Sequence, residues 1–320
     1  MSSIAVVGAG AWGTALALQA HRAGRKVVLW ARDPARAAAI AQTRTNPRLP
    51  GVTLPPEIAV VSDLPAADLL LLVVPMQHLR AVAAALPPGG PLVCCAKGIE
   101  LESLALPLEV LSAVQPGRPA AVLTGPNFAH EVAAGLPAAA VLAAASESLR
   151  TAALAALATP GFRLYGNDDA IGAQVGGAAK NVIAIAAGTV IGAGLGENAR
   201  AALVTRGLAE LGRLATALGG RAETVAGLSG LGDLLLTCTG TASRNFRFGL
   251  ALGHGQRTAD ILAGQSFVTE GVATAPALVR RALQARANVP ICAAVAAVVG
   301  GRITLEQAMT ALLARPLRDE

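Results

Sequence analysis

A short apolar run that ends in a glycine-rich turn, close to the start of the chain, constrains the fold most. Residues 4–10 read IAVVGAG, and Gly8-Ala9-Gly10-Ala11-Trp12-Gly13 forms a G-x-G-x-x-G pattern. The apolar run predicts a buried strand, and residues 12–23 predict a helix. A strand, a glycine turn and a helix in this order are typical of the first unit of a dinucleotide-binding sheet.

Each glycine of this turn has its own expected role. Gly8 permits the tight turn, Gly10 lets the backbone approach a pyrophosphate, and Gly13 lets the helix pack against the strand. The helix N-terminus adds unpaired N–H groups and a positive dipole end. Alanine- and glycine-rich chains also produce this pattern by chance. The preceding strand, and a second strand that ends about 20 residues later, therefore favour a nucleotide site.

Short apolar runs and helical stretches alternate through the first half of the chain. The run at 69–75, LLLLVVP, is continuous, as expected for a strand covered on both faces. The other predicted strands lie at 26–32, 91–98 and 120–126, with 138–145 and 162–166 as extensions of the sheet edge. Such alternation predicts a Rossmann-type, doubly wound parallel sheet.

Strand signals stop after about residue 168, and helical periodicity takes over. It is clearest at 201–218, 274–287 and 305–314. We therefore expect an α/β dinucleotide-binding domain at 1–168 and an all-α substrate-binding domain at 169–320. The segment around Lys180 is expected to form the connecting helix.

Lysine is rare in this chain and sits in segments that look like motifs. The 26 cationic residues comprise 23 arginines and three lysines, and Lys97 and Lys180 lie in CCAKGIE and GGAAKNVIAIAAG. A lysine can lose its proton in an apolar setting, whereas arginine remains charged. Both lysines are therefore candidate acid/base groups. The alternative is chance survival of surface lysines.

The residues after two neighbouring predicted strands are candidate ligand contacts. Lys97-Gly98 follows one strand, and Gly125-Pro126-Asn127 follows the next. In open parallel sheets, ligands bind at the carboxyl ends of the strands. Both loops should therefore face the cofactor crevice, although Gly125-Pro126 is also compatible with an ordinary turn.

The end of the second strand bears on the choice of cofactor. It reads Trp30-Ala31-Arg32-Asp33. An acidic residue there selects NAD, and an arginine accommodates the 2′-phosphate of NADP. Asp33 can instead cap the next helix ahead of Pro34. The sequence favours NADP(H) or use of both cofactors.

Polar residues of the second half predict a phosphate site. Asp233 and Thr237 are four residues apart and share a helix face. Ser243-Arg244-Asn245 offers a hydroxyl, a guanidinium and an amide in succession, which suits a phosphate monoester. A helix cap for Asp233 and a surface salt bridge for Arg244 are the structural alternatives.

These segments together resemble the bacterial NAD(P)-dependent glycerol-3-phosphate dehydrogenases. The resemblance covers nearly the whole chain in the family's order. It rests on GAGAWGTALA, AKGIE, GPNFA, GGAAKNVIAIAAG, TRGLAE, GLGDLLLTC and SRNFRFG. One departure is Asn127, at a position where the family usually carries a small hydroxyl residue. The resemblance implies a second domain like the C-terminal domain of 6-phosphogluconate dehydrogenase.

The resemblance implies reversible reduction of dihydroxyacetone phosphate by NAD(P)H to sn-glycerol 3-phosphate. Lys180 would be the proton donor and acceptor, with Lys97 and Asp233 as the other catalytic residues. The implied substrate contacts are Lys97, Gly125, Asn127, Lys180, Asp233, Thr237, Ser243, Arg244 and Asn245. The implied cofactor contacts are Gly8, Gly10, Ala11, Trp12, Gly13, Arg32, Lys97, Ala129, Arg244, Val268 and Glu270.

Composition sets the expected surroundings of the protein. A net charge of +6 without a basic run, and two tryptophans, one tyrosine and five phenylalanines, make nucleic acid a weak prediction. Cys94, Cys95, Cys238 and Cys292 show no zinc spacing and predict small buried side chains. The apolar run at 182–195 is too short to span a membrane. We expect a metal-free, soluble cytoplasmic protein. The resemblance implies a homodimer that serves phospholipid synthesis.

Two other functions are compatible with parts of the sequence. One is a two-domain dehydrogenase that acts on a β-hydroxyacid or ketopantoate and would need a carboxylate site. The other is a redox-sensing module that binds NAD(P) without chemistry. A redox-sensing module would give Lys97, Lys180 and Asp233 no chemical role.

Overall fold

The computed structural model describes residues 1–264 and 269–316. The chain divides into two compact units. The first comprises Met1–Lys97 and Ala105–Gln174, and the second comprises Gly98–Leu104 and Val175–Glu320. The chain therefore passes from one unit to the other more than once.

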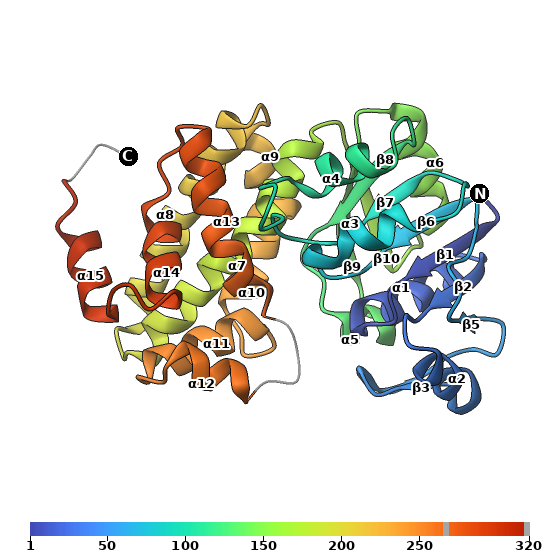
Figure 1. Cartoon of the computed structure of the whole chain (residues 1–320), viewed down its shortest axis with the longest axis horizontal. Helices are drawn as coiled ribbons and strands as arrows, with labels where there is room; N and C mark the ends of the chain where they lie inside the picture. Colours follow the sequence, from blue (N-terminus) through green and yellow to red (C-terminus); the bar gives the residue numbers. More distant parts are fainter. Residues whose placement is uncertain (265–268, 317–320) are drawn as a thin grey trace. The chain divides into compact units, whose positions relative to one another are not determined.

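The first unit is built on a sheet whose central strands are parallel (Figure 1). Every neighbouring pair is parallel except β8 and β9, so β9 and β10, at one end of the sheet, run opposite to the other strands. Across the sheet the strands are β10 (Phe162–Asn167), β9 (Ala138–Ala143), β8 (Ala120–Thr124), β7 (Leu92–Cys94), β6 (Leu69–Leu72), β1 (Ser3–Val7), β2 (Lys26–Trp30) and β5 (Ala59–Val61). The predicted doubly wound sheet and its edge extension are confirmed.

The helices of this unit explain why the central strands are apolar throughout. All four residues of β6 are buried, as the run at 69–75 predicted. Helix α2 (Pro34–Thr43) belongs to this unit and follows β2 in the chain. Helix α1 (Ala11–Arg22) packs with α5 (Ala129–Ala134) and α6 (Glu147–Leu157), and α3 (Met76–Ala84) packs with α4 (Pro107–Val114). A strand between two helical layers has no polar face.

Three short strands were missed by the sequence patterns. Strands β3 (Thr45–Asn46) and β4 (Leu49–Thr53) form an antiparallel pair, and β5 extends the main sheet beside β2. Strand β4 contains Pro50 and Gly51, which disfavour strand predictions. Each of these strands is held by pairing with a neighbour more than by its own apolar pattern.

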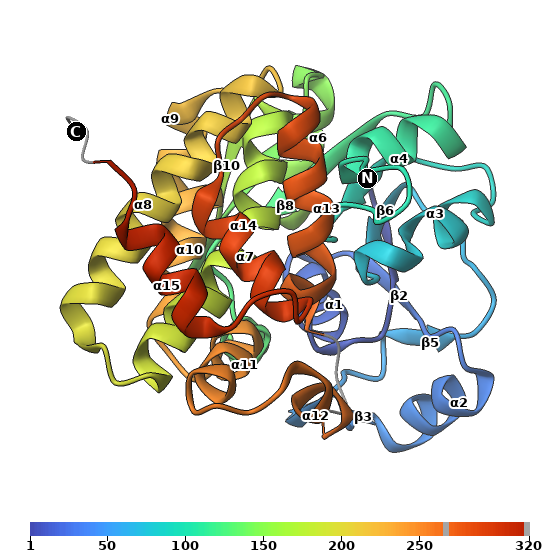
Figure 2. The ribbon, with the colours of Figure 1, turned by 60° about the vertical axis from the view of Figure 1, so that its left-hand side comes forward.

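All the regular elements in the described part of the second unit are helices (Figures 1 and 2). Its elements are α7 (Ala170–Gly192), α8 (Gly196–Ala217), α9 (Ala222–Ala226), a π-helical turn η1 (Leu228–Gly232), α10 (Asp233–Cys238), α11 (Arg244–Gly253), α12 (Thr258–Ala263), α13 (Glu270–Gln284), α14 (Pro290–Val299) and α15 (Leu305–Leu313). The predicted helices at 201–218, 274–287 and 305–314 correspond to α8, α13 and α15. The shorter helices lack enough turns to show a periodicity.

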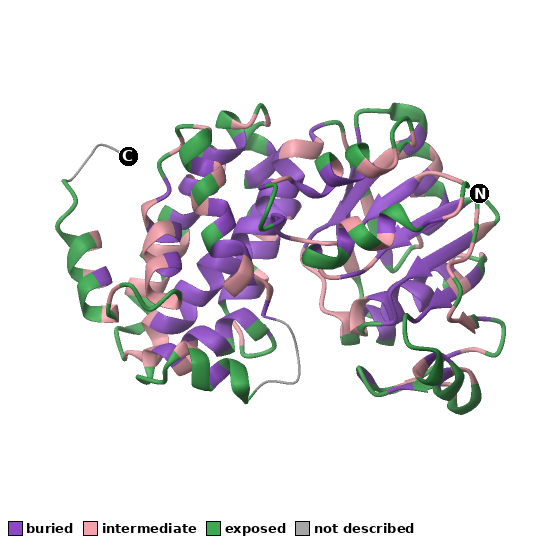
Figure 3. Ribbon diagram, in the orientation of Figure 1, coloured by how far each residue is buried: buried purple, intermediate pink, exposed green. Residues whose placement is uncertain are grey.

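Helix α7 is apolar on all sides and is the core helix of this unit. It appears mostly as buried ribbon in Figure 3. By length and composition it could cross a membrane, but 83% of its most apolar window lies buried inside the protein. Residues 182–195 predicted a shorter apolar segment than the 23-residue helix that the structure contains. An apolar surface on every side is typical of a helix surrounded by other helices.

Glycines let α7 and α11 pack with their backbones in contact. A Cβ atom at Gly188 would overlap the carbonyl oxygen of Phe246, and one at Gly249 would overlap that of Ile185. The glycines that interrupt the apolar run of α7 are therefore required by this close approach. The packing fixes α11 against the second half of α7.

The cysteines behave as small apolar side chains. All four are buried and free. Burial raises the pKa of the Cys94 thiol to about 12, and it does the same for Cys238. A thiol with so high a pKa is protonated at neutral pH and is a poor nucleophile.

Candidate active site

The phosphate-binding turn lies between β1 and α1, as predicted. Gly8 has a φ of +126°, and a Cβ atom there would overlap the carbonyl oxygen of Val73. A Cβ atom at Gly13 would overlap the carbonyl oxygen of Gly8. Packing and backbone conformation within the protein thus require glycine at positions 8 and 13.

Gly10 differs from the other two glycines of the turn. A Cβ atom there would meet nothing within 4 Å in the described part of the chain. The protein's own packing does not explain this glycine, but a ligand close to the backbone would. Gly10 is the N-cap of α1, whose first turn, starting at Ala11 and Trp12, contains no acidic residue. These features fit the pyrophosphate of a dinucleotide.

The residues at the end of β2 divide into one cap and one exposed cation. The carboxylate of Asp33 accepts a hydrogen bond of 3.0 Å from the Ala35 amide and caps α2. The capping interpretation of Asp33 is confirmed. Arg32 is exposed.

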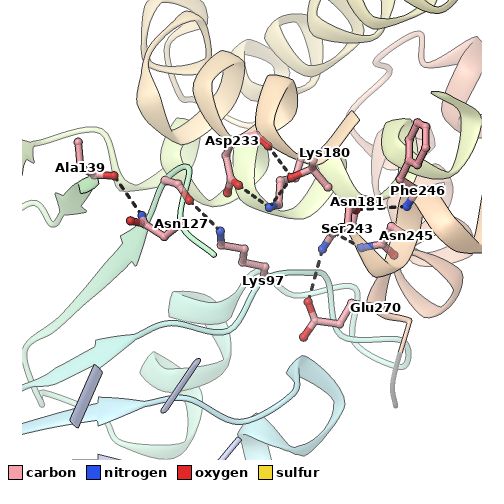
Figure 4. A network of polar contacts seen from close by, with 12 residues as sticks. Lys97, Asn127, Ala139, Lys180, Asn181, Asp233, Ser243, Asn245, Phe246 and Glu270 are labelled. Carbon is pink, nitrogen blue, oxygen red and sulfur yellow. Dashed lines mark hydrogen bonds and ion pairs between the residues drawn. The ribbon is translucent and has the colours of Figure 1, made fainter. Parts of the chain in front are cut away.

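The loops after β7 and β8 meet, as the sheet topology predicted. Lys97 Nζ donates to the carbonyl oxygen of Gly125 at 3.4 Å (Figure 4). Asn127 Nδ2 donates to the carbonyl oxygen of Ala139 at 3.1 Å. Its Oδ1 is buried and has no hydrogen-bond partner within residues 1–264 and 269–316. Ala129 begins α5 and is half-buried.

Lys180 lies in a buried polar cluster in the middle of α7. Its ammonium group forms an ion pair with Asp233 and donates to Thr237 Oγ1 at 2.9 Å (Figure 4). The exposed fractions are 8% for Lys180, 1% for Asp233 and 4% for Thr237. Burial on this scale excludes the interpretation of Lys180 as a surface lysine. A carboxylate at hydrogen-bonding distance stabilises the ammonium form of a lysine.

The π-helical turn η1 positions Asp233 in this cluster. Asp233 is the first residue of α10 and follows η1 directly. A Cβ atom at Gly176 of α7 would overlap the carbonyl oxygen of Ser229, so this turn packs tightly on α7. Turns of the π type are frequent at functional sites. Asp233 and Thr237 share a helix face, as their spacing predicted.

The residues of the predicted phosphate site begin α11. Ser243 is the N-cap, and its hydroxyl accepts a hydrogen bond of 3.2 Å from the Phe246 amide. Asn245 Nδ2 donates to Asn181 Oδ1 at 2.9 Å, and its Oδ1 accepts from the Gly271 amide at 3.0 Å. Arg244 is exposed on the first turn. Ser243 and Asn245 thus have structural bonds in addition to any contact with a ligand.

Asn181 is a polar residue that sequence reasoning missed. It is 4% exposed, follows Lys180 directly, and donates to Glu270 Oε2 at 3.4 Å (Figure 4). Asn181 thereby links the starts of α11 and α13 to α7. The available signal was its position beside the rare lysine. The predicted cofactor residue Val268 lies outside the described residues.

The described ranges 1–264 and 269–316 contain no group of three or more His, Cys, Asp or Glu that could hold a metal ion. The titratable groups of the buried cluster on α7 and α10 are Lys180 and Asp233. Such groups are suited to proton transfer and to the stabilisation of an oxyanion.

A nucleotide-binding sheet, together with a helical unit that buries a lysine–aspartate pair, defines the class of two-domain NAD(P)-dependent dehydrogenases. Sequence comparison is more specific. The N-terminal profile of the NAD-dependent glycerol-3-phosphate dehydrogenases matches residues 3–150, and the C-terminal profile matches residues 169–310. The chain belongs to this family, as the resemblance predicted.

Individual relatives agree with the family assignment. The chain is 61% identical to glycerol-3-phosphate dehydrogenase [NAD(P)+] of Acidiphilium cryptum, over 99% of this chain and 98% of the relative. It is 54% identical to that of Gluconobacter oxydans, over 98% of this chain and 97% of the relative. The crystal structure of glycerol-3-phosphate dehydrogenase from Coxiella burnetii matches with a TM-score of 0.93 at 37% identity, over 98% of this chain and 99% of that one.

Proposed function

We propose that the chain is an NAD(P)-dependent sn-glycerol-3-phosphate dehydrogenase, which reduces dihydroxyacetone phosphate reversibly at C2. The observation that carries the proposal is the buried Lys180–Asp233 ion pair in the region matched by the family's C-terminal profile. The nicotinamide cofactor supplies the hydride when it is bound. The side chains and backbone of this chain perform the other parts of the reaction.

Cofactor binding is proposed for two sets of residues. The turn and the start of α1 hold the pyrophosphate, and the support is the space at Gly10 and the uncapped first turn. The turn residues are Gly8, Gly10, Ala11, Trp12 and Gly13. The further proposed contacts are Arg32, Lys97, Ala129, Arg244, Val268 and Glu270.

Lys180 is the proposed proton donor to the C2 oxygen of dihydroxyacetone phosphate. Reduction of the ketone turns this oxygen into an alkoxide, which needs one proton. The Lys180 ammonium can give it, and the neutral amine takes it back in the reverse reaction. Asp233 and Thr237 hold the amine, because both contact Nζ. Arginine could not replace Lys180, since it does not release its proton.

Lys97 is the proposed partner for the negative charge that develops on the same oxygen. Its contact with Gly125 fixes the direction of its side chain. Asn127 is a proposed substrate contact through Oδ1. That atom is buried and unsatisfied among the described residues, and a substrate hydroxyl could donate to it.

The phosphate group of the substrate is proposed to bind at the start of α11. Arg244 supplies a charge-assisted contact, and Ser243, Asn245 and Thr237 supply polar groups. The support is that Ser243 and Asn245 are already held in place by bonds to the backbone and to Asn181. Residues with fixed rotamers lose little entropy when a ligand binds.

Oxidation of NADPH and NADH by the purified protein, followed at steady state with dihydroxyacetone phosphate, tests the proposed function. We expect turnover that requires the phosphorylated ketone. Inorganic phosphate and glycerol 3-phosphate should compete with it, and simple carboxylates should not. Competition by carboxylates would instead identify a hydroxyacid or ketopantoate dehydrogenase. Tight cofactor binding without turnover would identify a redox sensor.

Three broader statements complete the proposal. The cofactor-binding domain is 1–168, and the substrate-binding domain is 169–320. The product feeds glycerophospholipid synthesis in the cytoplasm, and the enzyme acts as a homodimer. The support for these statements is membership of the family. Light scattering of the purified protein tests the dimer, which a monomeric mass would exclude.

A further inference from the structure

Two glycines allow close packing around the π-helical turn that precedes Asp233. A Cβ atom at Gly176 of α7 would lie 2.5 Å from the carbonyl oxygen of Ser229 and 2.9 Å from the Cα atom of Gly230. A Cβ atom at Gly230 would lie 1.9 Å from the carbonyl oxygen of Val225 in α9. The backbone of η1 is therefore held between α7 and α9, with no space for a side chain on either glycine.

The approach of η1 to α7 lies one helical turn before the buried ion pair. Lys180 follows Gly176 by four residues, so both lie on the same face of α7. Asp233 follows Ser229 by four residues as well. The two segments therefore run side by side in one register, in which Gly176 meets Ser229 and Lys180 meets Asp233.

Hydrogen bonds within the turn make it a rigid connection. The Gly232 amide donates to the carbonyl oxygen of Gly227 at 3.1 Å across the turn. Ser229 is 1% exposed, and its hydroxyl donates to the carbonyl oxygen of Thr224 at 3.1 Å. Because close-packed interiors transmit strain, a displacement at Ser229 would move Asp233 with it.

The Lys180–Asp233 contact depends strongly on such a displacement. Both side chains are buried, as Figure 4 illustrates for their contact in the polar network. A buried charge that loses its partner is left without compensation from water. A shift of about 1 Å in a catalytic group can slow a reaction about a hundredfold.

We infer that Gly176 is a positioning residue for proton transfer by Lys180. Its lack of a side chain sets the depth at which η1 packs on α7, and thereby the separation of Asp233 from the Lys180 ammonium group. The inference rests on the proposed function for the role of Lys180 as proton donor. It assigns a task in the reaction to a residue whose effect passes through Asp233.

A pair of glycine variants on the same helix tests the inference. Gly192 lies at the end of α7, and a Cβ atom there would lie 2.3 Å from the carbonyl oxygen of Leu250. Gly192→Ala is therefore as tight a substitution as Gly176→Ala, but it lies twelve residues, or about 18 Å, from Lys180. Denaturant titrations compare the stability of the two variants.

The two variants should differ in turnover. Gly176→Ala should lower kcat about tenfold to a hundredfold, because it moves Asp233 away from Lys180. Gly192→Ala should keep kcat within about twofold of the wild type, and both variants should keep the Kd of NADPH within about twofold.

A double-mutant cycle separates this role from a general structural one. In the Asp233→Asn background, Gly176→Ala should lower kcat no further, because its effect passes through the carboxylate. A general structural defect would lower kcat by the same factor in both backgrounds.

The rarity of lysine allows a measurement without substrate. The chain contains only Lys26, Lys97 and Lys180, so NMR spectra of protein labelled with ¹³C at the lysine ε-carbon contain few signals. Lys26→Arg and Lys97→Arg identify the Lys180 signal by elimination. This signal should shift in Gly176→Ala in the same direction as in Asp233→Asn, and it should stay in place in Gly192→Ala.

A milder variant extends the test if Gly176→Ala does not fold. Ser229→Ala adds no atoms and removes the bond to Thr224. It should lower kcat about threefold, and it should have no effect in the Asp233→Asn background.

Three results would overturn the inference. These are a normal kcat in Gly176→Ala, an equal loss of kcat in both backgrounds, and a Lys180 signal that does not respond to Gly176→Ala. A signal that responds as expected, in a protein that does not reduce dihydroxyacetone phosphate, would refute the proposed function. The control of the ion pair by Gly176 would then still stand.

Discussion

The phosphate-binding turn and the Lys180 cluster are built from different parts of the chain. The turn is made of backbone: three glycines within one motif fix its shape, and positions 8 and 13 tolerate no Cβ atom. The cluster is made of side chains from α7, α10 and α11, brought together from positions 180 to 245. A backbone site is encoded locally, whereas a side-chain site depends on how helices pack.

This difference explains what could be predicted. The strand, turn and helix around Gly10 followed from residue spacing, because their geometry depends on neighbours in sequence. The spacing of Asp233 and Thr237 predicted a shared face. It could not predict that Lys180 lies against both, because that contact depends on η1 and on close packing with α7. The rarity of lysine made Lys180 a candidate acid/base group, whereas the role of Asp233 came from resemblance to a family and not from periodicity.

The missed elements follow the same rule. Strands β3 and β4 carry no apolar alternation, yet they place Asn46 beside the turn. Asn181 was passed over because a single asparagine in an apolar helix has no pattern. Both residues are recognisable only when their hydrogen-bond partners are known.

The largest effect is expected for Lys180→Arg. Turnover should fall about a thousandfold or more, because the guanidinium cannot exchange the proton at the C2 oxygen. Cofactor affinity should stay within a few-fold, since the phosphate-binding turn is unchanged. Steady-state kcat and calorimetric Kd values measure the two sites separately. Near-normal turnover would show that Lys180 is not the proton donor. The Lys180 cluster could then no longer be compared with the phosphate-binding turn as a catalytic site.

Arg244→Ala should raise the KM for dihydroxyacetone phosphate about tenfold to a hundredfold. The reason is the loss of a charge-assisted contact with the phosphate group. A larger effect on KM than on kcat would assign Arg244 to binding. Arg247→Ala, an exposed arginine on the same helix, is the control. An unchanged KM in Arg244→Ala would contradict its role.

Gly249→Ala tests the dependence of the side-chain site on helix packing. The added methyl group would overlap the Ile185 carbonyl oxygen and force α11 away from α7. The free energy of unfolding should fall by about 1–3 kcal/mol. Gly240→Ala, where a Cβ atom meets nothing within 4 Å of the described chain, should change it by less than about 0.5 kcal/mol. Equal effects in denaturant titrations would show that the glycines are not packing residues.

The smallest effect is expected for Glu210→Gln. Glu210 of α8 is 1% exposed and accepts from the amides of Ile291 and Cys292 at 2.6 and 3.1 Å. A glutamine side chain can accept only one of these bonds well. The free energy of unfolding should therefore fall by about 1 kcal/mol near pH 4.5. The effect shows whether a buried carboxyl group in the helical unit can serve packing alone.

The pH dependence of that effect has a definite direction. Burial raises the pKa of the Glu210 carboxyl above its ordinary value of 4.5. As pH rises above 4.5, the unfolded chain releases this proton before the folded protein does, so the stability contribution of Glu210 is progressively lost. The free energy of unfolding of the wild type should therefore fall, relative to that of Glu210→Gln, as pH rises. Denaturant titrations from pH 4.5 to 8 measure it, and a shift toward the wild type would contradict it.

The interleaved course of the chain has a consequence for how such enzymes can recombine. Gly98–Leu104 belongs to the helical unit although it is encoded within the first 168 residues, and Arg280 donates to the Leu101 carbonyl oxygen at 3.4 Å. Swapping the N-terminal half with that of a distant homologue would also replace this short, partly buried stretch of the other unit. Chimaeras should therefore retain solubility only when the seven-residue stretch travels with its own helical partner.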